Sequence, residues 1–461
     1  MSEDQRTPMN SGMGHFSSLR ANVGQFDLAS KTVLIPEMSR AGCLLLAATM
    51  RSFGVSAQVM ETYGGLHLGK QFTSGKECFP CQVTLGDLLV HLEKEKKKLG
   101  DGFRPENYVY FMAETGGPCR FGMYNKLHRI ILDSMDGLSR TPIASISSKD
   151  SYALGGLMAP ELRRDFRRTA YLAVVVGDVL DRILWRTRPY EKEKGLAEAR
   201  FEENLTAMTE AVETHGRRKR FRLILKALER LAGKAKEIID PAIPPKPLIG
   251  MIGEIYLRTH RPSNQEIIRL LEEHGAEVVN ASLAEWINFV SYQSLRQEGR
   301  KVVLGLRRRD PAAFRRHLKA WLRHRTELTY QYLRQDQVYR RVRRRLAIHS
   351  DHRISHLERQ LDGDRLFSFA VGTEACLSIG SALEYALGGF DGIVNVFPFT
   401  CMPSTMSSAI LKPLLDRLQI PYMDSAYDGT FQPNREAAVR AFMYQASQHQ
   451  GERLTRGRSR P

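Results

Sequence analysis

The sequence predicts an α/β protein with two mostly parallel sheets, joined by helices and each open at the carboxyl ends of its strands. Short apolar runs alternate with helical patterns in two separate stretches, and the region between these stretches carries helical patterns alone. Alternation of strands and helices builds parallel sheets with helices on both faces. A chain of 461 residues is long enough for two or three domains, each with its own core.

The first α/β domain is expected at residues 31–150, after a polar tail of residues 1–30 that we expect to be disordered. The tail lacks the charged and then apolar layout of a signal peptide. Within the domain, alternating apolar runs and helical patterns predict strands at 32–36, 56–61, 107–113 and 143–146, and helices at 40–53, 84–99 and 122–135.

Residues 151–245 are expected to form a helical connector that ends in a stiff proline-rich linker, PAIPPKP, at 241–247. The second α/β domain is expected at residues 246–448. Its strands are predicted at 248–255, 276–280, 367–371, 392–397 and 420–423, and its helices at 263–274, 374–387, 403–418 and 435–445. Ser263 and Glu266 have the spacing of a capping box at the start of the first of these helices.

The net charge of +17 is concentrated in two segments. Between Arg300 and Arg345 there are sixteen Lys or Arg residues and three acids, and the stretch from Gly451 to Pro461 has four Arg and one Glu, so these segments hold 16 of the 17 charges. The rest of the chain is a nearly neutral body. We expect a basic helical insertion at about 297–362, in which the apolar spacing from Phe314 to Leu346 predicts a long amphipathic helix, and a disordered basic tail at 449–461.

The arrangement of the basic residues bears on the partners of the protein. Aromatic side chains are not interleaved with them in a stacking pattern, so we do not expect nucleic acid as a ligand. The basic insertion is interpreted as a solvated helix face or as a dock for an acidic partner or a phosphorylated ligand. No apolar run reaches the roughly 18–20 residues that a membrane span needs, and we expect a cytoplasmic protein without membrane contact.

The six cysteines fall into two groups, and in a cytoplasmic chain we do not expect them to form disulfides. Cys43 and Cys376 lie within apolar helical patterns and are interpreted as core residues. The other four lie in loops that lead into helices, where unpaired N–H groups favour the thiolate; they are Cys78, Cys81, Cys119 and Cys401. Thiolates on several such loops suit an iron–sulfur cluster in the cleft between the domains, while a zinc site, a redox pair at Cys78 and Cys81, and no metal at all remain alternatives.

Five segments together resemble a known family, and they occur in order between about residues 32 and 444. They are GKECFPCQVTLGD, AETGGPCRFGMYN, GEIYLRTHRPSNQEII, LAEWINF and NVFPFTCMPSTM. These segments resemble the D-component-like, activase-related proteins of the 2-hydroxyacyl-CoA dehydratase and benzoyl-CoA reductase superfamily. The resemblance implies two flavodoxin-like (Rossmann-like) domains that hold a 4Fe–4S cluster between them through three cysteines.

Carried over to this chain, the resemblance implies Cys78, Cys119 and Cys401 as the cluster ligands, with Cys81 either a fourth ligand or a bystander. It also implies a separate ATP-dependent activase that donates a low-potential electron, because this chain has no G-x-x-x-x-G-K-[ST] phosphate loop. An acyl-CoA substrate and a homodimer or hetero-oligomer are expected by analogy with the family.

Further candidate residues flank the expected strand ends. Glu254 and Arg258 are candidate catalytic or ligand-binding residues, and Tyr256 and Asn264 lie close to them; helix capping or a salt bridge is the alternative role for each. Glu114 and Arg120 flank Cys119 and are expected to tune a cluster through outer contacts.

Two functional hypotheses follow. The first is a 4Fe–4S-dependent enzyme of lyase or reductase type. The resemblance implies that the electron turns an acyl-CoA thioester into a ketyl radical, and that loss of the hydroxyl then makes the β-proton acidic enough to remove. The second is a non-catalytic electron-transfer or scaffold subunit of a larger complex.

Overall fold

The computed structural model confirms a mixed α/β architecture with two sheets whose paired strands are all parallel. It describes residues 23–24, 28, 30–148, 152, 154, 157–363 and 365–458. The strand orders are β1-β5-β4-β2-β3 in the first sheet and β7-β6-β8-β9 in the second. When β1 is left out and the remaining strands of each sheet are numbered along the chain, starting at β2 and at β6, both sheets have the order 2-1-3-4. The winding reverses between β2 and β4 and between β6 and β8, and ligands bind at such switch points.

The first half follows the predicted alternation closely. Its strands are β1 (Val23–Gly24), β2 (Thr32–Ile35), β3 (Ser56–Val59), β4 (Tyr108–Phe111) and β5 (Ile143–Ala144), and its α-helices are α2 (Arg40–Ser52), α3 (Leu66–Gln71), α4 (Phe79–Leu99) and α5 (Tyr124–Ser134). Residues 23–24 of the predicted disordered tail are therefore part of the sheet, because β1 pairs with β5. The first 22 residues of that predicted tail lie outside the described part of the chain.

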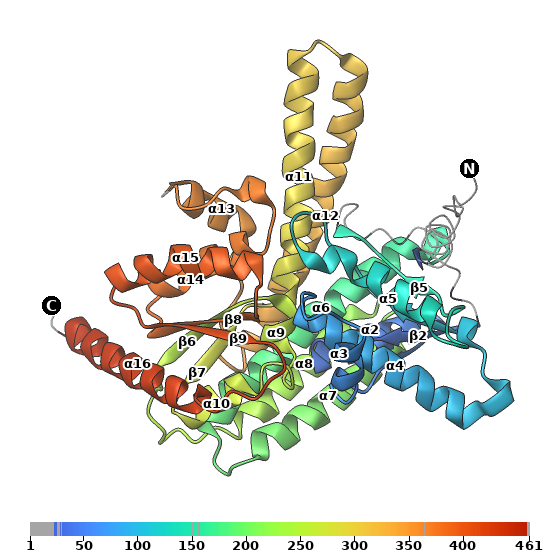
Figure 1. Cartoon of the computed structure of the whole chain (residues 1–461). Helices are drawn as coiled ribbons and strands as arrows, with labels where there is room; N and C mark the ends of the chain where they lie inside the picture. The colour runs from blue at the N-terminus through green and yellow to red at the C-terminus, as the bar shows by residue number, and fades with distance from the viewer. Residues whose placement is uncertain are drawn as a thin grey trace, which may run out of the picture.

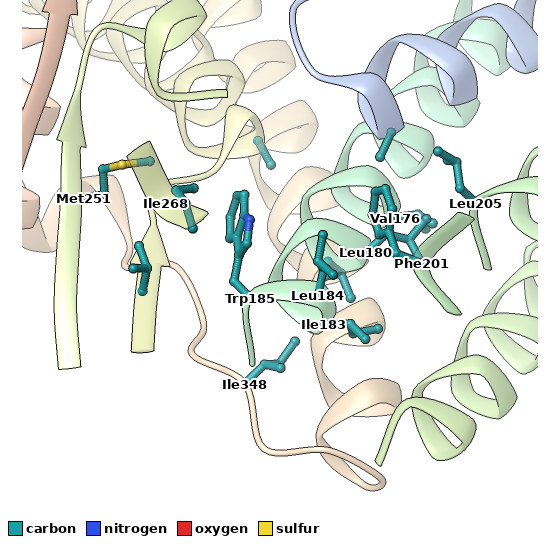
Figure 2. Packing of buried hydrophobic residues seen from close by; sticks show 14 of the residues in the cluster. Val176, Leu180, Ile183, Leu184, Trp185, Phe201, Leu205, Met251, Ile268 and Ile348 are labelled. Atoms are coloured by element: carbon teal, nitrogen blue, oxygen red, sulfur yellow. The ribbon is translucent and has the colours of Figure 1, made fainter. Parts of the chain in front are cut away.

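The predicted helical connector is confirmed and contains α6 (Pro160–Thr187), the 3₁₀ turn η5 (Arg188–Tyr190), α7 (Leu196–His215) and α8 (Phe221–Lys236). Helix α6 belongs to a core cluster that both halves share. Figure 2 shows Val176, Leu180 and Leu184 within this cluster, which extends to Met251 of the second sheet. Although α6 has 28 residues, neither it nor any other helix in the described ranges is long and apolar enough to cross a membrane.

Polar contacts fix α6 to the second half. The buried guanidinium of Arg182 donates to the Tyr339 hydroxyl at 2.7 Å, to the carbonyl of Asn280 at 3.1 Å and to the carboxylate of Asp351. Asp178, one turn earlier, accepts hydrogen bonds of 2.9 Å from the backbone N–H groups of Leu283 and Ala284, at the start of α11. The connector therefore holds the two halves in a defined arrangement.

The second half contains β6 (Leu248–Gly253), β7 (Glu277–Asn280), β8 (Gly392–Pro398) and β9 (Tyr422–Tyr427), with α9 (Ile255–Thr259), α10 (Ile267–Glu273), α14 (Ala375–Leu387), α15 (Met402–Arg417) and α16 (Arg435–Arg458). The predicted strand at 367–371 is wrong, because Phe369–Val371 form a 3₁₀ turn. The predicted capping box is also absent. The Ser263 hydroxyl pairs with His260 instead, and Glu266 has a positive φ of 55°.

The end of the chain differs from the predicted disordered tail at 449–461. Helix α16 continues to Arg458. The buried carboxylate of Asp391 anchors it by accepting hydrogen bonds from His449 at 3.1 Å and Arg453 at 2.9 Å. Ion pairing with a buried acid thus extends the helix beyond the predicted end at residue 445.

The basic insertion is a helical hairpin, and the long amphipathic helix predicted from Phe314 to Leu346 is present as its second helix. It consists of α11 (Leu283–Arg307) and α12 (Pro311–Arg343), which pack against each other and project from the body as the yellow hairpin in Figure 1. Asp310 caps α12 by accepting a hydrogen bond from Ala313, and Pro311 occupies its first turn. The shorter helix α13 (Ile354–Gly363) and the turn η6 (Phe369–Val371) follow before α14.

Candidate functional site

Three of the predicted loop cysteines are N-cap residues of helical segments that follow strands. Cys78 caps α4, Cys119 caps the 3₁₀ turn η3 (Arg120–Met123) that leads into α5, and Cys401 caps α15. Each has an extended backbone, and prolines occupy the first turns of α4 and α15. The positive end of a helix stabilises a negative charge at its N-terminus, so these positions suit thiolate ligands.

The three cysteines line one cavity of about 670 Å³ together with residues of both halves. Cys78 and Cys401 are buried, while Cys119 is half-buried. They come from loops at the carboxyl ends of β4 and β8 and from the start of α4, far apart in the sequence. The switch-point strands of the two sheets therefore aim their loops at a common space.

Arg120 ties the three cysteine loops together. Its guanidinium donates to the carbonyl of Lys76 at 2.6 Å, to the carbonyl of Thr400 at 3.0 Å and to the Thr400 hydroxyl at 3.2 Å. Lys76 precedes Cys78 by two residues and Thr400 directly precedes Cys401. A single side chain next to Cys119 thus bridges the loops of the other two cysteines. The sequence indicated Arg120 as an outer contact, and the structure adds this bridging geometry.

Burial makes these cysteines poor thiolates on their own. It raises the pKa of Cys119 and of Cys401 to about 12 and the pKa of Cys78 well above its usual value. The carboxylate of Glu254 adds to each rise, whereas hydrogen bonds from Tyr124 to Cys78 and from Ser404 to Cys401 oppose it. A bound cation would reverse this balance, because metal binding deprotonates thiols.

The remaining cysteines are placed differently. Cys81 does not line the cavity; it is buried in α4, where its sulfur lies 3.5 Å from Nε2 of His128. Cys376 is buried in the core of the second half, as predicted for a core residue. Cys43 also packs in a core cluster. It lines part of the cavity wall, but it lies in α2 and not in one of the three cysteine loops.

The other predicted site residues are divided between the cavity wall and its support. Glu254 lines the cavity and also caps α9, accepting hydrogen bonds from the N–H groups of Tyr256 and Leu257 at 3.1 and 2.9 Å. Gly253 before it has a φ of +118°, and a Cβ there would lie 2.0 Å from the carbonyl oxygen of Val396. Only glycine allows this turn, which directs Glu254 into the cavity.

Arg258 lies behind this wall and not on it. Its side chain is fully buried, donates to the carbonyl of Ser282 at 3.4 Å, and lowers the pKa of Glu254 against the larger effect of burial. Asn264 is buried and bonded to the carbonyl of Leu257. Glu114 points away from the cavity and pairs with Lys126. The structure thus does not bring Arg258, Asn264 or Glu114 to the surface that a ligand would contact.

One cavity residue was missed by sequence reasoning, namely Glu374. It lines the cavity and is the N-cap of α14, and its Oε1 is buried without a hydrogen-bond partner. Burial, and then the charge of Glu254, raise its pKa well above its usual value. The feature of the sequence that could have identified Glu374 is its position. It is the N-cap of the helix before β8, just as Cys78 is the N-cap of the helix before β4.

Among the described residues, no three His, Cys, Asp or Glu side chains are arranged to hold a single metal ion. A single zinc ion needs every thiolate within about 2.3 Å. A cluster has a different requirement, because it offers a separate iron to each thiolate. The chemistry of the site, with three thiols on three N-caps and one bridging cation, fits the second requirement.

Comparisons with known proteins add no identification. No protein-family model matches the sequence, and no curated protein is significantly similar to it. The assignment of function therefore rests on the site itself.

Proposed function

We propose that the protein is an iron–sulfur protein of the 2-hydroxyacyl-CoA dehydratase type, with a 4Fe–4S cluster in the cleft between two flavodoxin-like domains. The observation that carries this proposal is the convergence of Cys78, Cys119 and Cys401 on one cavity between the halves. The shared strand order 2-1-3-4, which is the flavodoxin order, supports the domain assignment.

When bound, such a cluster supplies one-electron chemistry at low potential. The proposed electron donor is an ATP-dependent activase, and the proposed substrate is an acyl-CoA-like or other small molecule. The protein contributes position and environment: Arg120 holds the three loops in register, and apolar walls extend the cavity away from the cysteines. Glu254 and Glu374 line the side of the cavity that belongs to the second half and provide carboxyl groups next to the cysteines.

The alternative is a non-catalytic electron-transfer or scaffold subunit. It expects Cys81 to act as a fourth ligand and the cleft to lack room for a substrate. Cys81 lies outside the cavity wall and the cavity measures about 670 Å³, and both observations favour the enzyme.

Anaerobic purification followed by iron and sulfide analysis and EPR spectroscopy tests the proposal. We expect about four iron and four sulfide per chain and an EPR signal after reduction. Cys119→Ala should lose most of the iron, whereas Cys81→Ala and the core control Cys376→Ala should keep it. A colourless protein with stoichiometric zinc would contradict the proposal, and iron loss in Cys81→Ala would favour the electron-transfer subunit.

A further inference from the structure

The cavity extends well beyond the cysteines, into the first half between its sheet and the helices α2 and α6. Its walls there are apolar side chains that are only half-buried, because they face the cavity: Leu46, Val55, Phe111, Ile146 and Ala170. On one side they pack against the buried core cluster of the first half. On the other side they surround a space that the described part of the chain leaves open.

The size and polarity of this space suit a small-molecule ligand. Its volume of about 670 Å³ is within the usual range of roughly 300–1,000 Å³ for ligand pockets. Apolar cavities stay dry and take up apolar molecules, because water finds too few hydrogen-bond partners in them. Elsewhere on the wall, the partly exposed side chains of Arg167 and Glu327 form an ion pair at 3.5 Å, and the hydroxyl of Tyr171 is bonded to Asn288 at 2.8 Å.

The cavity is polar at its cysteine end. Glu254, Glu374 and Arg120 line this end, and the lining residues Thr400 and Met402 are exposed to solvent. A ligand that enters here would place its apolar tail inside and its head group at the cysteines. Glu254 and Glu374 offer no positive charge to an anionic head. The nearby guanidinium groups are already engaged, that of Arg120 with Lys76 and Thr400 and that of Arg258 with the carbonyl of Ser282. The wall therefore selects a neutral head group.

We propose that the cavity binds neutral derivatives of long-chain aliphatic acids or alcohols, with the head at Cys78, Cys119 and Cys401 and the chain along α6. This inference deepens the proposed function by naming the chain type of its substrate. The binding of the chain depends only on the apolar walls, so it can be measured separately from the cluster.

The test is displacement of the neutral fluorescent probe N-phenyl-1-naphthylamine from the anaerobically purified full-length protein. Hexanol, octanol, decanol and dodecanol should displace the probe with an affinity that rises up to roughly fourfold per methylene. Dodecanoate at pH 8 should bind at least about tenfold more weakly than dodecanol, because its carboxylate loses hydration at this wall without gaining a free cation. No probe binding, or no dependence on chain length, would overturn the proposal.

Two variants locate the binding site. Ala170→Trp fills the cavity from α6 and Ile146→Trp fills it from the sheet, and each should weaken decanol binding by at least about tenfold, since the lost chain burial is worth several methylenes. Arg164→Trp adds the same side chain at an exposed position of α6 and should leave binding unchanged. Wild-type affinity in both folded cavity variants would place the ligand elsewhere and contradict the proposal.

Iron analysis of the same preparations separates this inference from the proposed function. An iron-free protein that binds decanol in the cavity would contradict the function alone. An iron-loaded protein without chain-length dependence would contradict the ligand class alone.

Discussion

The two halves of the molecule share one strand order but carry different residues at equivalent positions. In each half the third strand leads to a cysteine, Cys119 after β4 and Cys401 after β8. The helix before that strand is capped by Cys78 in the first half and by Glu374 in the second. The comparison teaches that topology brings these four N-caps to the same cavity as the N-caps of α2 and α9, whereas the side chain at each N-cap decides its chemistry.

The halves also differ in how their sheets are covered. In the second half Tyr385 of α14 packs directly on the sheet, so closely that a Cβ on Gly250 would lie 2.3 Å from its ring. In the first half Phe111 of β4 and Phe166 of α6 line the cavity, and this face forms its apolar part. The sheet face of the second half is thus filled by its own side chains, whereas that of the first half borders the space for a ligand.

The largest expected effect comes from separating the second half from the connector. Arg182→Met should lower the free energy of unfolding by about 3–5 kcal/mol, because the buried carboxylate of Asp351 loses its cation. Urea unfolding measures this change. Arg186→Met, on the same helix, removes a more exposed pair with Glu277 and should cost about 1 kcal/mol or less. Equal losses in both variants would show that Arg182 does not hold the halves together.

Stability should also depend on pH through Glu285, at the base of the hairpin. Burial, with a smaller effect of Asp351, raises its pKa from 4.5 to about 7 in the folded protein. The folded state then holds more protons than the unfolded state between these values, so stability falls as the pH rises from 4.5 to 7. We expect a loss of about 1–3 kcal/mol across this window.

Urea unfolding at pH 5 and pH 8 checks this expectation. Glu285→Gln should reduce the dependence by about this amount, while exposed Glu436→Gln should not. The rest of the dependence remains because burial also raises the pKa of Asp87, Asp178 and Glu272 to about 7. A wild-type protein that is more stable at pH 8 than at pH 5 would be inconsistent with a neutral Glu285.

A smaller effect is expected when the loops of the two halves are uncoupled. Arg120→Ala removes the hydrogen bonds to Lys76 and Thr400 and should lower the free energy of unfolding by about 1–2 kcal/mol. It should also speed the release of iron to a chelator. Arg120→Lys keeps the charge but loses the planar fork, so it should restore little of either property. Full rescue by lysine would mean that charge alone matters.

The smallest change in stability, within about 1 kcal/mol, is expected for Glu374→Cys. This variant gives both halves the same N-cap residue and offers a fourth thiol to the cavity. In the proposed cluster, three cysteines would leave one iron without a protein ligand, so the EPR spectrum of the wild type should respond to added cyanide. If the N-caps are equivalent, the new thiol would bind that iron and the spectrum of Glu374→Cys should no longer respond. Glu374→Gln is the matched control and should keep the response. An unchanged response in Glu374→Cys would show that Glu374 does not occupy a fourth ligand position.

Sequence reasoning located most of the site but not its geometry. Cysteines in loops before helices were recognisable because turns and helix starts are local patterns, and Cys78, Cys119 and Cys401 do line one cavity. The charged insertion was correctly expected to be helical, but its turn at residues 308–310 was missed within an otherwise continuous helical pattern. The strand predicted at 367–371 was wrong because a short apolar run does not distinguish a strand from a buried turn.

By itself, the sequence determined the alternation of strands and helices, the neutral body with its basic insertion, and the loops that carry the cysteines. These features depend on residues within about one or two turns of each other. The tertiary structure decided which groups meet: Cys81 turns toward His128, Arg120 reaches two distant loops, and Glu374 completes the cavity wall. These contacts join residues up to 280 positions apart, and only the packing of both halves against α6 brings such residues together.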